Sequence, residues 1–232
     1  ADILVLPEEC LTLKMPDEAK TALSQDKQVV QTLSDIARQY NLWLIAGSVP
    51  QDYRDGKYYA TLLAFDNEGT VQGRYQKIHL FDVEVGVGKT YHESNQVLAG
   101  KDPKLLTTPF GKIGLSICYD LRFPELYRHY MRQGADILLV PSAFTPQTGL
   151  VHWHTLLKAR AIENLCYVVA PNQNGLRANG EGTFGHSLII GPWGEVLAEL
   201  ETGIGIVTAE INLATLKQVR NRFPALEHQR LP

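Results

Sequence analysis

Cys118 is placed where a thiol could act as a nucleophile. It ends a short apolar run, and Pro124 then opens a helical pattern. The positive end of a helix dipole favours a thiolate, which is the nucleophilic form of cysteine. A lone cysteine is more often a small buried hydrophobic residue. Here Tyr119, Asp120 and Arg122 follow it, and polar groups just beyond a strand end are costly to bury unless a site uses them.

Two further residues carry groups that could assist such a thiol. Glu8 follows Pro7 at the end of a short apolar strand, where a carboxylate is a candidate general base. Lys77 ends a second strand-like run. Taken alone, Glu8 is more often a solvated residue at a strand end, and Lys77 is more often a surface lysine.

Two motifs that could indicate a cofactor lack the surrounding pattern. Residues 88–90 read Gly-Lys-Thr, but the glycine that a phosphate loop needs five residues earlier is replaced by Val83. His152 and His154 would point to different faces of a helix, and no accompanying cysteine or His-Glu-x-x-His pattern supports zinc. We therefore expect no metal and no cofactor.

Composition limits the classes of partner. The chain has 232 residues, with 22 Lys and Arg against 25 Asp and Glu, which gives a net charge of −3. That balance argues against nucleic acid or an anionic membrane as the main partner. No apolar run approaches the roughly 20 residues of a membrane helix. Three widely spaced cysteines do not make a disulfide scaffold, so we expect a reducing compartment, the cytoplasm.

The elements that must position these residues alternate along the whole chain without a linker. We therefore expect a single α/β or α+β domain over residues 1–232. Helical periodicity predicts helices over residues 20–40, 124–134, 151–164 and 213–219. Apolar runs predict strands over residues 4–6, 42–49, 58–65, 70–77, 112–118, 137–140, 167–170, 187–190, 195–200 and 204–211. Residues 82–104 are predicted to form a long loop, which in a compact domain is often functional.

One stretch of the sequence is echoed later in the chain. Residues 1–7 resemble residues 135–141, and both read as a buried strand that ends at a proline. The similarity has two explanations that the sequence leaves equally open, chance likeness between buried strands or two related halves.

Together these motifs resemble the nitrilase (carbon–nitrogen hydrolase) superfamily. Its pattern places Glu after Pro, Lys before a short stretch containing His, and Cys after a strand, as in residues 6–8, 75–82 and 117–125 here. A second family glutamate falls at Glu93. The likeness continues to the end of the chain through residues 141–144, 152–153, 160–163, 185–187 and 192–194.

The resemblance implies a four-layer α-β-β-α sandwich of the nitrilase type, in which each subunit contributes an αββα unit with two central sheets. It also implies a homodimer or a higher homo-oligomer. The family has a further strand and helix before the Pro-Glu motif, so we expect the first βα unit to be missing from this chain. The loop after Asp82 lacks the family's Pro-Gly turn, which leaves the accepted substrate length open.

The implied reaction is hydrolysis of a primary amide on a small substrate that bears a carboxylate. The products are a carboxylic acid and ammonia, formed through a thioester on Cys118. By resemblance Glu8 is the general base, Lys77 and the backbone N–H of Tyr119 stabilise the oxyanion, and Glu93 orients Lys77 and Glu8.

Substrate choice is expected to follow from charge. Arg122 can bind a carboxylate with two parallel hydrogen bonds, unless it pairs with Glu125 or Asp120 instead. Phe144 and Thr148 are expected to wall the pocket. Within the superfamily the chain most resembles the deaminated glutathione amidase branch. The alternatives are an ω-amidase acting on α-ketoglutaramate, a nitrilase or N-carbamoyl hydrolase, and a binding module without catalysis.

Overall fold

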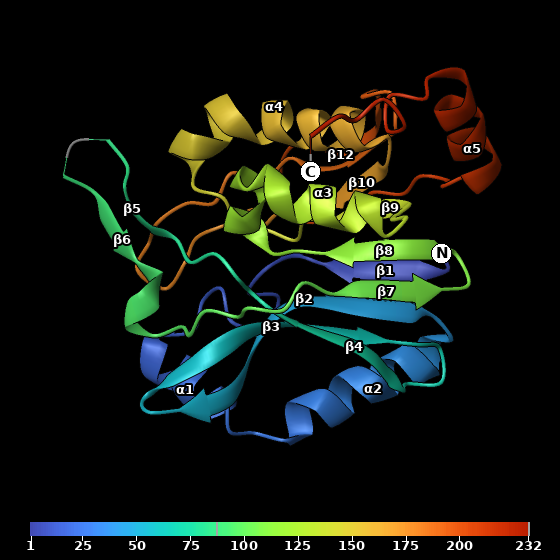
Figure 1. The fold of residues 1–232 in the computed structure, drawn as a ribbon. Helices are drawn as coiled ribbons and strands as arrows, with labels where there is room; N and C mark the ends of the chain where they lie inside the picture. Colours follow the sequence, from blue (N-terminus) through green and yellow to red (C-terminus); the bar gives the residue numbers. More distant parts are fainter. Residues whose placement is uncertain (87, 232) are drawn as a thin grey trace.

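Two β-sheets stacked between helices form the molecule (Figure 1). The computed structural model describes residues 1–86 and 88–231. Helices α1 (Asp17–Leu23) and α2 (Gln28–Tyr40) lie on the outer face of the first sheet. Helices α3 (Pro124–Arg132) and α4 (Pro146–Asn164) cover the outer face of the second. The layers run α-β-β-α within one chain, which confirms the architecture that the resemblance implied.

The first sheet has four strands in the order β1-β2-β3-β4. Strand β1 is parallel to β2, with Ile3 opposite Trp43, and the remaining pairs are antiparallel. The strands are β1 (Ile3–Leu6), β2 (Trp43–Arg54), β3 (Lys57–Phe65) and β4 (Val71–Gln76).

The second sheet has six strands in the order β12-β11-β10-β9-β8-β7. Its three central strands, β8 to β10, are parallel, and the outer pairs are antiparallel. The strands are β7 (Leu105–Thr108), β8 (Gly111–Leu115), β9 (Ile137–Leu139), β10 (Tyr167–Ala170), β11 (Ser187–Ile190) and β12 (Val196–Leu200). Helix α5 (Leu213–Arg222) follows near the C-terminus, as its apolar periodicity predicts.

Alternation along β2 explains how the first sheet is buried on both faces. Leu44 and Ala46 pack against α2, whereas Trp43 and Ile45 point into the space between the sheets. Successive side chains of a strand point to opposite faces, so one strand serves both cores. The core between the sheets continues beneath α3 and α4, which fixes the two sheets against each other.

The two strands of the sequence echo, β1 and β9, belong to different sheets, and their C-terminal ends meet. Gly47 lies between them, where an added Cβ would be 2.3 Å from the carbonyl oxygen of Leu6 and 2.5 Å from Cβ of Pro141. Only glycine fits such a close approach. The residues that follow β1 are therefore brought against those that follow the strands of the second sheet.

The helix predicted over residues 20–40 is divided into α1 and α2. Between them the Ser24 hydroxyl donates to the carbonyl of Thr21, and the Asp26 carboxylate accepts from the N–H of Gln28 at 2.8 Å. Polar side chains that bond to nearby backbone compete with helix continuation and favour helix ends. Apolar periodicity alone could not detect this break.

The segment over residues 82–104, predicted as a loop, contains regular structure. Strands β5 (Asp82–Glu84) and β6 (Thr90–His92) form a two-stranded ribbon, and the short 3-10 helix η1 (Glu93–Asn95) follows. The ribbon projects away from the two sheets (Figure 1). Each strand is only three residues long, which is too short for a clear alternating pattern.

The strand predicted over residues 204–211 is absent from the described chain. Residues 204–210 have no regular structure, and the side chains of Ile204 and Ile206 are largely exposed. The apolar residues suggested burial, but β12 is already the edge of the sheet and this segment does not pair with it. The prediction was wrong because a strand also needs a neighbour to complete its backbone hydrogen bonds.

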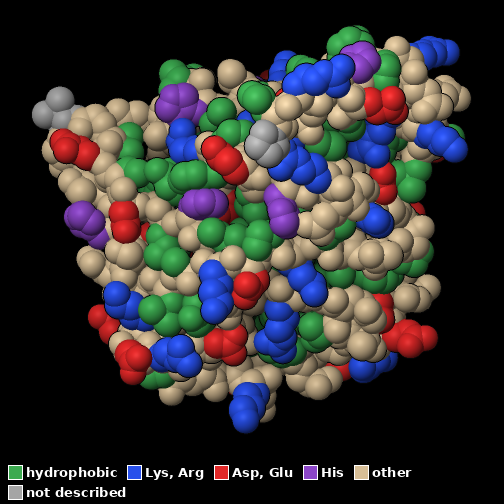
Figure 2. All heavy atoms as spheres, viewed as in Figure 1, with side chains coloured by type: hydrophobic (Ala, Val, Ile, Leu, Met, Phe, Trp, Pro, Cys, Tyr) green, Lys and Arg blue, Asp and Glu red, His purple; other side chains and the backbone are tan. Residues whose placement is uncertain are grey.

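Acidic and basic side chains are interspersed on the face shown in Figure 2, in keeping with the small net charge. Among the described residues, no helix has the length and apolar character needed to cross a bilayer.

Candidate active site

Cys118 opens the 3-10 helix η2 (Cys118–Arg122) just beyond the end of β8. Its φ of +48° is rare for a residue other than glycine. Its N–H donates to the carbonyl of Pro141 at 2.9 Å, which ties the turn to the end of β9. Such strained backbone persists only where the surrounding structure enforces it, and it is common at functional sites.

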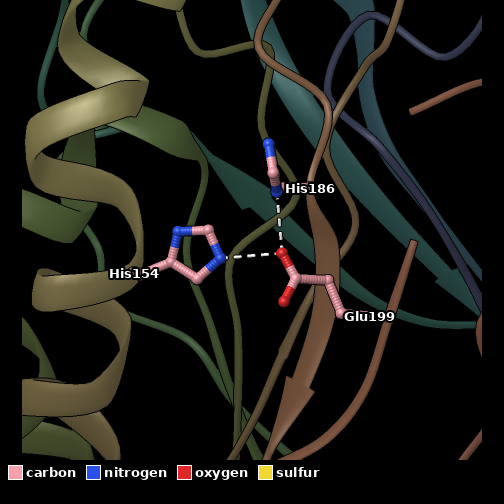
Figure 3. A group of neighbouring side chains, drawn as sticks. All are labelled: His154, His186 and Glu199. Atoms are coloured by element: carbon pink, nitrogen blue, oxygen red, sulfur yellow. Dashed lines mark hydrogen bonds and ion pairs between the residues drawn. The ribbon is translucent and has the colours of Figure 1, made fainter. Parts of the chain in front are cut away.

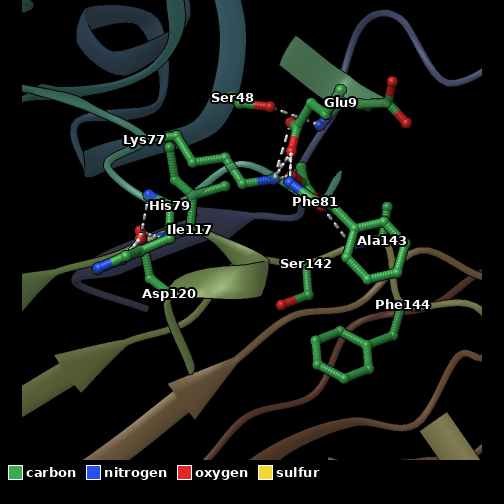
Figure 4. Close-up of polar contacts among 12 residues, drawn as sticks. Glu9, Ser48, Lys77, His79, Phe81, Ile117, Asp120, Ser142, Ala143 and Phe144 are labelled. Atoms are coloured by element: carbon green, nitrogen blue, oxygen red, sulfur yellow. Dashed lines mark hydrogen bonds and ion pairs between the residues drawn. The ribbon is translucent and has the colours of Figure 1, made fainter. Parts of the chain in front are cut away.

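Asp120 supports this turn from beneath and is fully buried. One carboxylate oxygen accepts from the N–H of Ile117 at 2.8 Å and from the hydroxyl of Tyr75 at 2.6 Å. The other accepts from the N–H of His79 at 3.0 Å and lies 2.7 Å from its ring Nδ1 (Figure 4). The sequence singled out Asp120 as one of several polar residues after the strand, but it could not reveal these partners.

Glu8 is brought to the thiol by the exit from β1. The residue is 5% exposed, and one carboxylate oxygen lies 2.8 Å from Nζ of Lys77. The other oxygen accepts from the N–H of Ala143 at 2.8 Å. The thiol of Cys118 lies near the same carboxylate, whose negative charge raises the pKa of the thiol. Lys77 and Ala143 thus each hold one oxygen of the Glu8 carboxylate.

Lys77 follows β4 and is almost completely buried, at 1% exposure. Its Nζ lies 2.9 Å from each carboxylate oxygen of Glu93, in addition to its contact with Glu8. Glu93 opens η1 and also accepts from the N–H of Phe81 at 2.6 Å. The four residues that the sequence proposed as catalytic therefore meet at one point, although they come from four separate segments.

The charges at this point determine which groups carry protons. Burial favours the neutral amine of Lys77, but the carboxylates of Glu8 and Glu93 outweigh it and raise the pKa of Lys77 well above its usual range. Burial, reinforced by the negative charge of Glu8, raises the pKa of Cys118. Burial also raises the pKa of Glu93, with the Lys77 charge opposing it. Lys77 is therefore an ammonium ion, and the resting thiol is protonated.

These side chains line a cavity of about 710 Å³, a size typical of small-molecule sites. All four predicted substrate-binding residues, Tyr119, Arg122, Phe144 and Thr148, also line it. Arg122 lies over the rings of Tyr119 and Phe144, 5.6 Å from each centroid.

The nearest polar partner of Arg122 is His152, with Nη1 3.2 Å from the ring Nδ1. Within the part of the chain that the structure describes, Arg122 forms no ion pair with Asp120 or Glu125. The guanidinium group is half-buried at the cavity wall, where a carboxylate could approach it.

Several charged residues of the cavity wall were not singled out from the sequence, and three of them contact one another. Glu9, Lys20 and Arg177 form a connected group in which Lys20 Nζ lies 2.5 Å from one Glu9 oxygen and Arg177 bonds the other. Burial opposes ionisation of Glu9, but the two cations outweigh it and lower its pKa. Glu9 directly follows the proposed base, which was the one available signal.

A second polar cluster lies outside the cavity wall. His154 on α4 and His186 before β11 both approach the same oxygen of Glu199 on β12, at 2.7 Å each (Figure 3). His154 thus has partners that the His-x-His spacing could not reveal. Both ring nitrogens approach the same carboxylate oxygen, so hydrogen bonds join the three side chains.

Comparisons with known proteins agree with this geometry. The model of the carbon–nitrogen hydrolase family matches residues 1–221. Deaminated glutathione amidase of Synechocystis is 44% identical over 99% of this chain and 86% of its own length. The crystal structure of the Caenorhabditis elegans NitFhit protein superposes with a TM-score of 0.91 at 37% identity, over 99% of this chain and 57% of that one. The structure of yeast Nit3, a member of the nitrilase superfamily, gives 0.87 at 31% identity, over 100% of this chain and 84% of that one. The chain belongs to the carbon–nitrogen hydrolase family, and it is an amidase.

Proposed function

We propose that this protein hydrolyses an amide of a small carboxylate-bearing substrate through a thioester on Cys118, with deaminated glutathione as its substrate. The observation that carries the proposal is the buried contact of Lys77 with Glu8 and Glu93 beside the Cys118 thiol. A buried ammonium between two carboxylates is costly unless a site uses it.

In the first half of the reaction Glu8 takes the proton of the Cys118 thiol. The sulfur attacks the amide carbon, and the carbonyl oxygen becomes an oxyanion. Lys77 and the backbone N–H of Tyr119 stabilise that charge, and Glu93 keeps Lys77 directed into the site. Glu8 then returns its proton to the departing nitrogen, the carbon–nitrogen bond breaks and a thioester remains.

In the second half Glu8 acts again as a base. It takes a proton from a water molecule, whose oxygen attacks the thioester carbon. The carbon–sulfur bond breaks, the thiol regains a proton and the carboxylic acid is released. The same carboxylate thus serves both halves, which fits its position between the thiol and Lys77.

The chemical nature of the substrate decides the leaving group. A primary amide, such as α-ketoglutaramate, releases ammonia. Glutathione is a tripeptide whose amides are both secondary, so its deaminated form releases an amine instead. The support for this substrate is the name of the relatives at 38–44% identity, together with a cavity large enough for more than a short amide.

The proposal is tested by incubating the protein with deaminated glutathione, α-ketoglutaramate, a nitrile and an N-carbamoyl amino acid. Mass spectrometry detects a released peptide amine, and coupled assays detect ammonia and carbon dioxide. We expect the highest kcat/KM with deaminated glutathione and an amine product. Faster ammonia release from α-ketoglutaramate would instead identify an ω-amidase.

Two cysteine variants control this experiment. Cys118→Ala should abolish turnover of every substrate without changing the circular dichroism spectrum. Cys10→Ala, a change to a cysteine outside the cavity wall, should retain turnover. Turnover by Cys118→Ala above background would reject the thioester mechanism.

We also propose a homo-oligomer, at least a dimer, in a reducing compartment such as the cytoplasm. The support for association is a set of exposed apolar side chains near the β12 edge and the C-terminal segment, including Ile162, Trp193, Val196, Leu197, Ile204, Ile206 and Phe223. The support for a reducing compartment is the three free cysteines. Light scattering after gel filtration tests the first point, and a monomeric mass would contradict it.

A further inference from the structure

Arg177 connects two parts of the site that hold the proposed base. Its Nη1 donates to a carboxylate oxygen of Glu9, and its Nη2 donates to the carbonyl of Ala143 at 2.7 Å. The N–H of Ala143 in turn donates to the Glu8 carboxylate at 2.8 Å. Since Glu8 and Glu9 are adjacent in the chain, these contacts form a closed ring that runs from Glu8 through Glu9, Arg177 and Ala143 back to the Glu8 carboxylate.

The remaining contacts of Glu9 make this ring rigid. Glu9 has a φ of +55°, and its N–H donates to the hydroxyl of Ser48 at 3.0 Å, a contact seen in Figure 4. The side chain of Gln173 donates to the carbonyl of Glu8 at 2.9 Å. Both Gln173 and Arg177 belong to the segment between β10 and β11, so this one segment hydrogen bonds to both Glu8 and Glu9.

We propose that Arg177 is a positioning residue for the general base Glu8, acting through Glu9 on one side and through Ala143 on the other. This inference rests on the role of Glu8 in the proposed function. Arginine suits the task because its planar fork offers two donors in fixed directions, whereas lysine offers a single point charge.

Arg177 also supplies positive charge close to the reacting groups. The groups that face Glu8 come from every side: Lys77 after β4, Glu93 on η1, Cys118 on η2, and Glu9, Lys20 and Arg177 at the cavity wall. Removal of one cation from this set leaves the negative charge of the site less compensated. Loss of Arg177 should therefore move the acid limb of the reaction to higher pH as well as disturb the position of Glu8.

The test compares Arg177→Met and Arg177→Lys with the wild type on two substrates of similar size, succinamate and the neutral butyramide. For Arg177→Met we expect kcat to fall about tenfold or more on both substrates, with little change in KM. We expect the acid limb of the kcat/KM profile to move to higher pH. Arg177→Lys keeps the charge, so its acid limb should stay in place while kcat remains reduced.

Lys89→Met is the matched control. Lys89 pairs with Glu181 on the same segment as Arg177, at 2.9 Å, but it does not touch the ring around Glu8. The Lys89→Met variant removes a cation and the ion pair that this cation makes with Glu181. We expect it to leave both kcat and the acid limb unchanged.

Three results would overturn the inference. The first is that Arg177→Met keeps the wild-type kcat and the wild-type acid limb. If Arg177→Met does not fold, a wild-type kcat in Arg177→Lys is the result that counts instead. The second is a loss confined to succinamate, which would make Arg177 a substrate-binding residue. The third is an equal effect of Lys89→Met. Failure of the proposed function itself is distinguishable, because it would appear as turnover in Cys118→Ala, whatever Arg177 does.

Discussion

Nζ of Lys77 lies 2.8 Å from a carboxylate oxygen of Glu8, although 69 positions separate the two residues in the chain. Both groups are buried, so their ion pair offsets part of the cost of removing two charges from water. This contact joins the exit of β1 to the exit of β4 on the two outer strands of the first sheet. The proposed general base and the proposed oxyanion donor are thereby fixed relative to each other before substrate enters.

Replacement of Lys77 by Met, which has a similar length and no charge, should remove the proposed oxyanion donor. We expect kcat to fall by about 100-fold to 1000-fold, the usual effect of losing one such donor. Turnover is measured with saturating substrate. A loss of less than about fivefold would contradict the assigned role.

The same variant should change how stability depends on pH. Burial already raises the pKa of Glu93, and loss of the ammonium removes the main group opposing that rise. A carboxyl group whose folded-state pKa is raised contributes stability below its unfolded-state pKa and loses it as pH rises through the folded-state value. Urea unfolding should therefore show a larger deficit relative to the wild type at about pH 8 than at about pH 5.

Replacement of Arg122 by Ala tests the predicted carboxylate clamp. We expect kcat/KM for succinamate to fall by about tenfold to 100-fold, because a charge-assisted contact to the substrate is lost. Butyramide has no carboxylate and should change by less than about threefold. The matched variant His152→Ala removes the polar neighbour of Arg122 but not the guanidinium, so it should preserve the preference for succinamate. Equal losses on both substrates would argue against the clamp.

Replacement of Glu93 by Gln should lower the plateau of kcat and extend activity to lower pH. Burial and the negative charge of Glu8 raise the pKa of Glu93, so the wild type loses the charge of this partner of Lys77 as pH falls. Glutamine cannot titrate, and it also removes a negative charge near Glu8. The acid limb of the kcat/KM profile should therefore move to lower pH, the direction opposite to that expected for Arg177→Met. An acid limb that stays in place would indicate that Glu93 does not act on the base.

Replacement of Asp120 by Asn should weaken both folding and catalysis. An amide NH₂ group would then face donors, either the N–H of Ile117 and the hydroxyl of Tyr75 or the N–H of His79, where the carboxylate now accepts. A buried donor without a partner costs about 1–3 kcal/mol, so we expect a comparable loss in the free energy of unfolding. The exposed control Asp35→Asn should change it by less than about 0.5 kcal/mol. Wild-type kcat in Asp120→Asn would show that the turn does not need this support.

Much of the fold was predictable from local patterns. The alternation and apolar runs that define most strands depend only on neighbouring residues, and so does the periodicity of α3, α4 and α5. The break between α1 and α2 depended on side-chain hydrogen bonds, and the absence of the strand predicted over residues 204–211 depended on the lack of a neighbour. Such contacts are not visible in a hydrophobic pattern.

The sequence allowed the candidate catalytic residues to be predicted, but not the residues that hold them in place. Glu8, Lys77, Glu93 and Cys118 could be proposed because they match an ordered family pattern, and the structure brings them together. The contacts of Asp120 and Arg177 join residues 41 and 168 positions apart, and nothing in the local sequence indicates them. Residues that hold others in place are recognised by what they touch, which only the folded chain reveals.

Cys118 is attached to the six-stranded sheet, whereas Glu8 and Lys77 are attached to the four-stranded one. The distance between the Cys118 sulfur and the Glu8 carboxylate therefore depends on how the two sheets are aligned. A small slip of one sheet over the other would separate the proposed nucleophile from the proposed base without breaking a single strand. Changes in the packing between the sheets, such as a side chain introduced at Gly47, should therefore abolish catalytic activity at temperatures where the protein still remains folded.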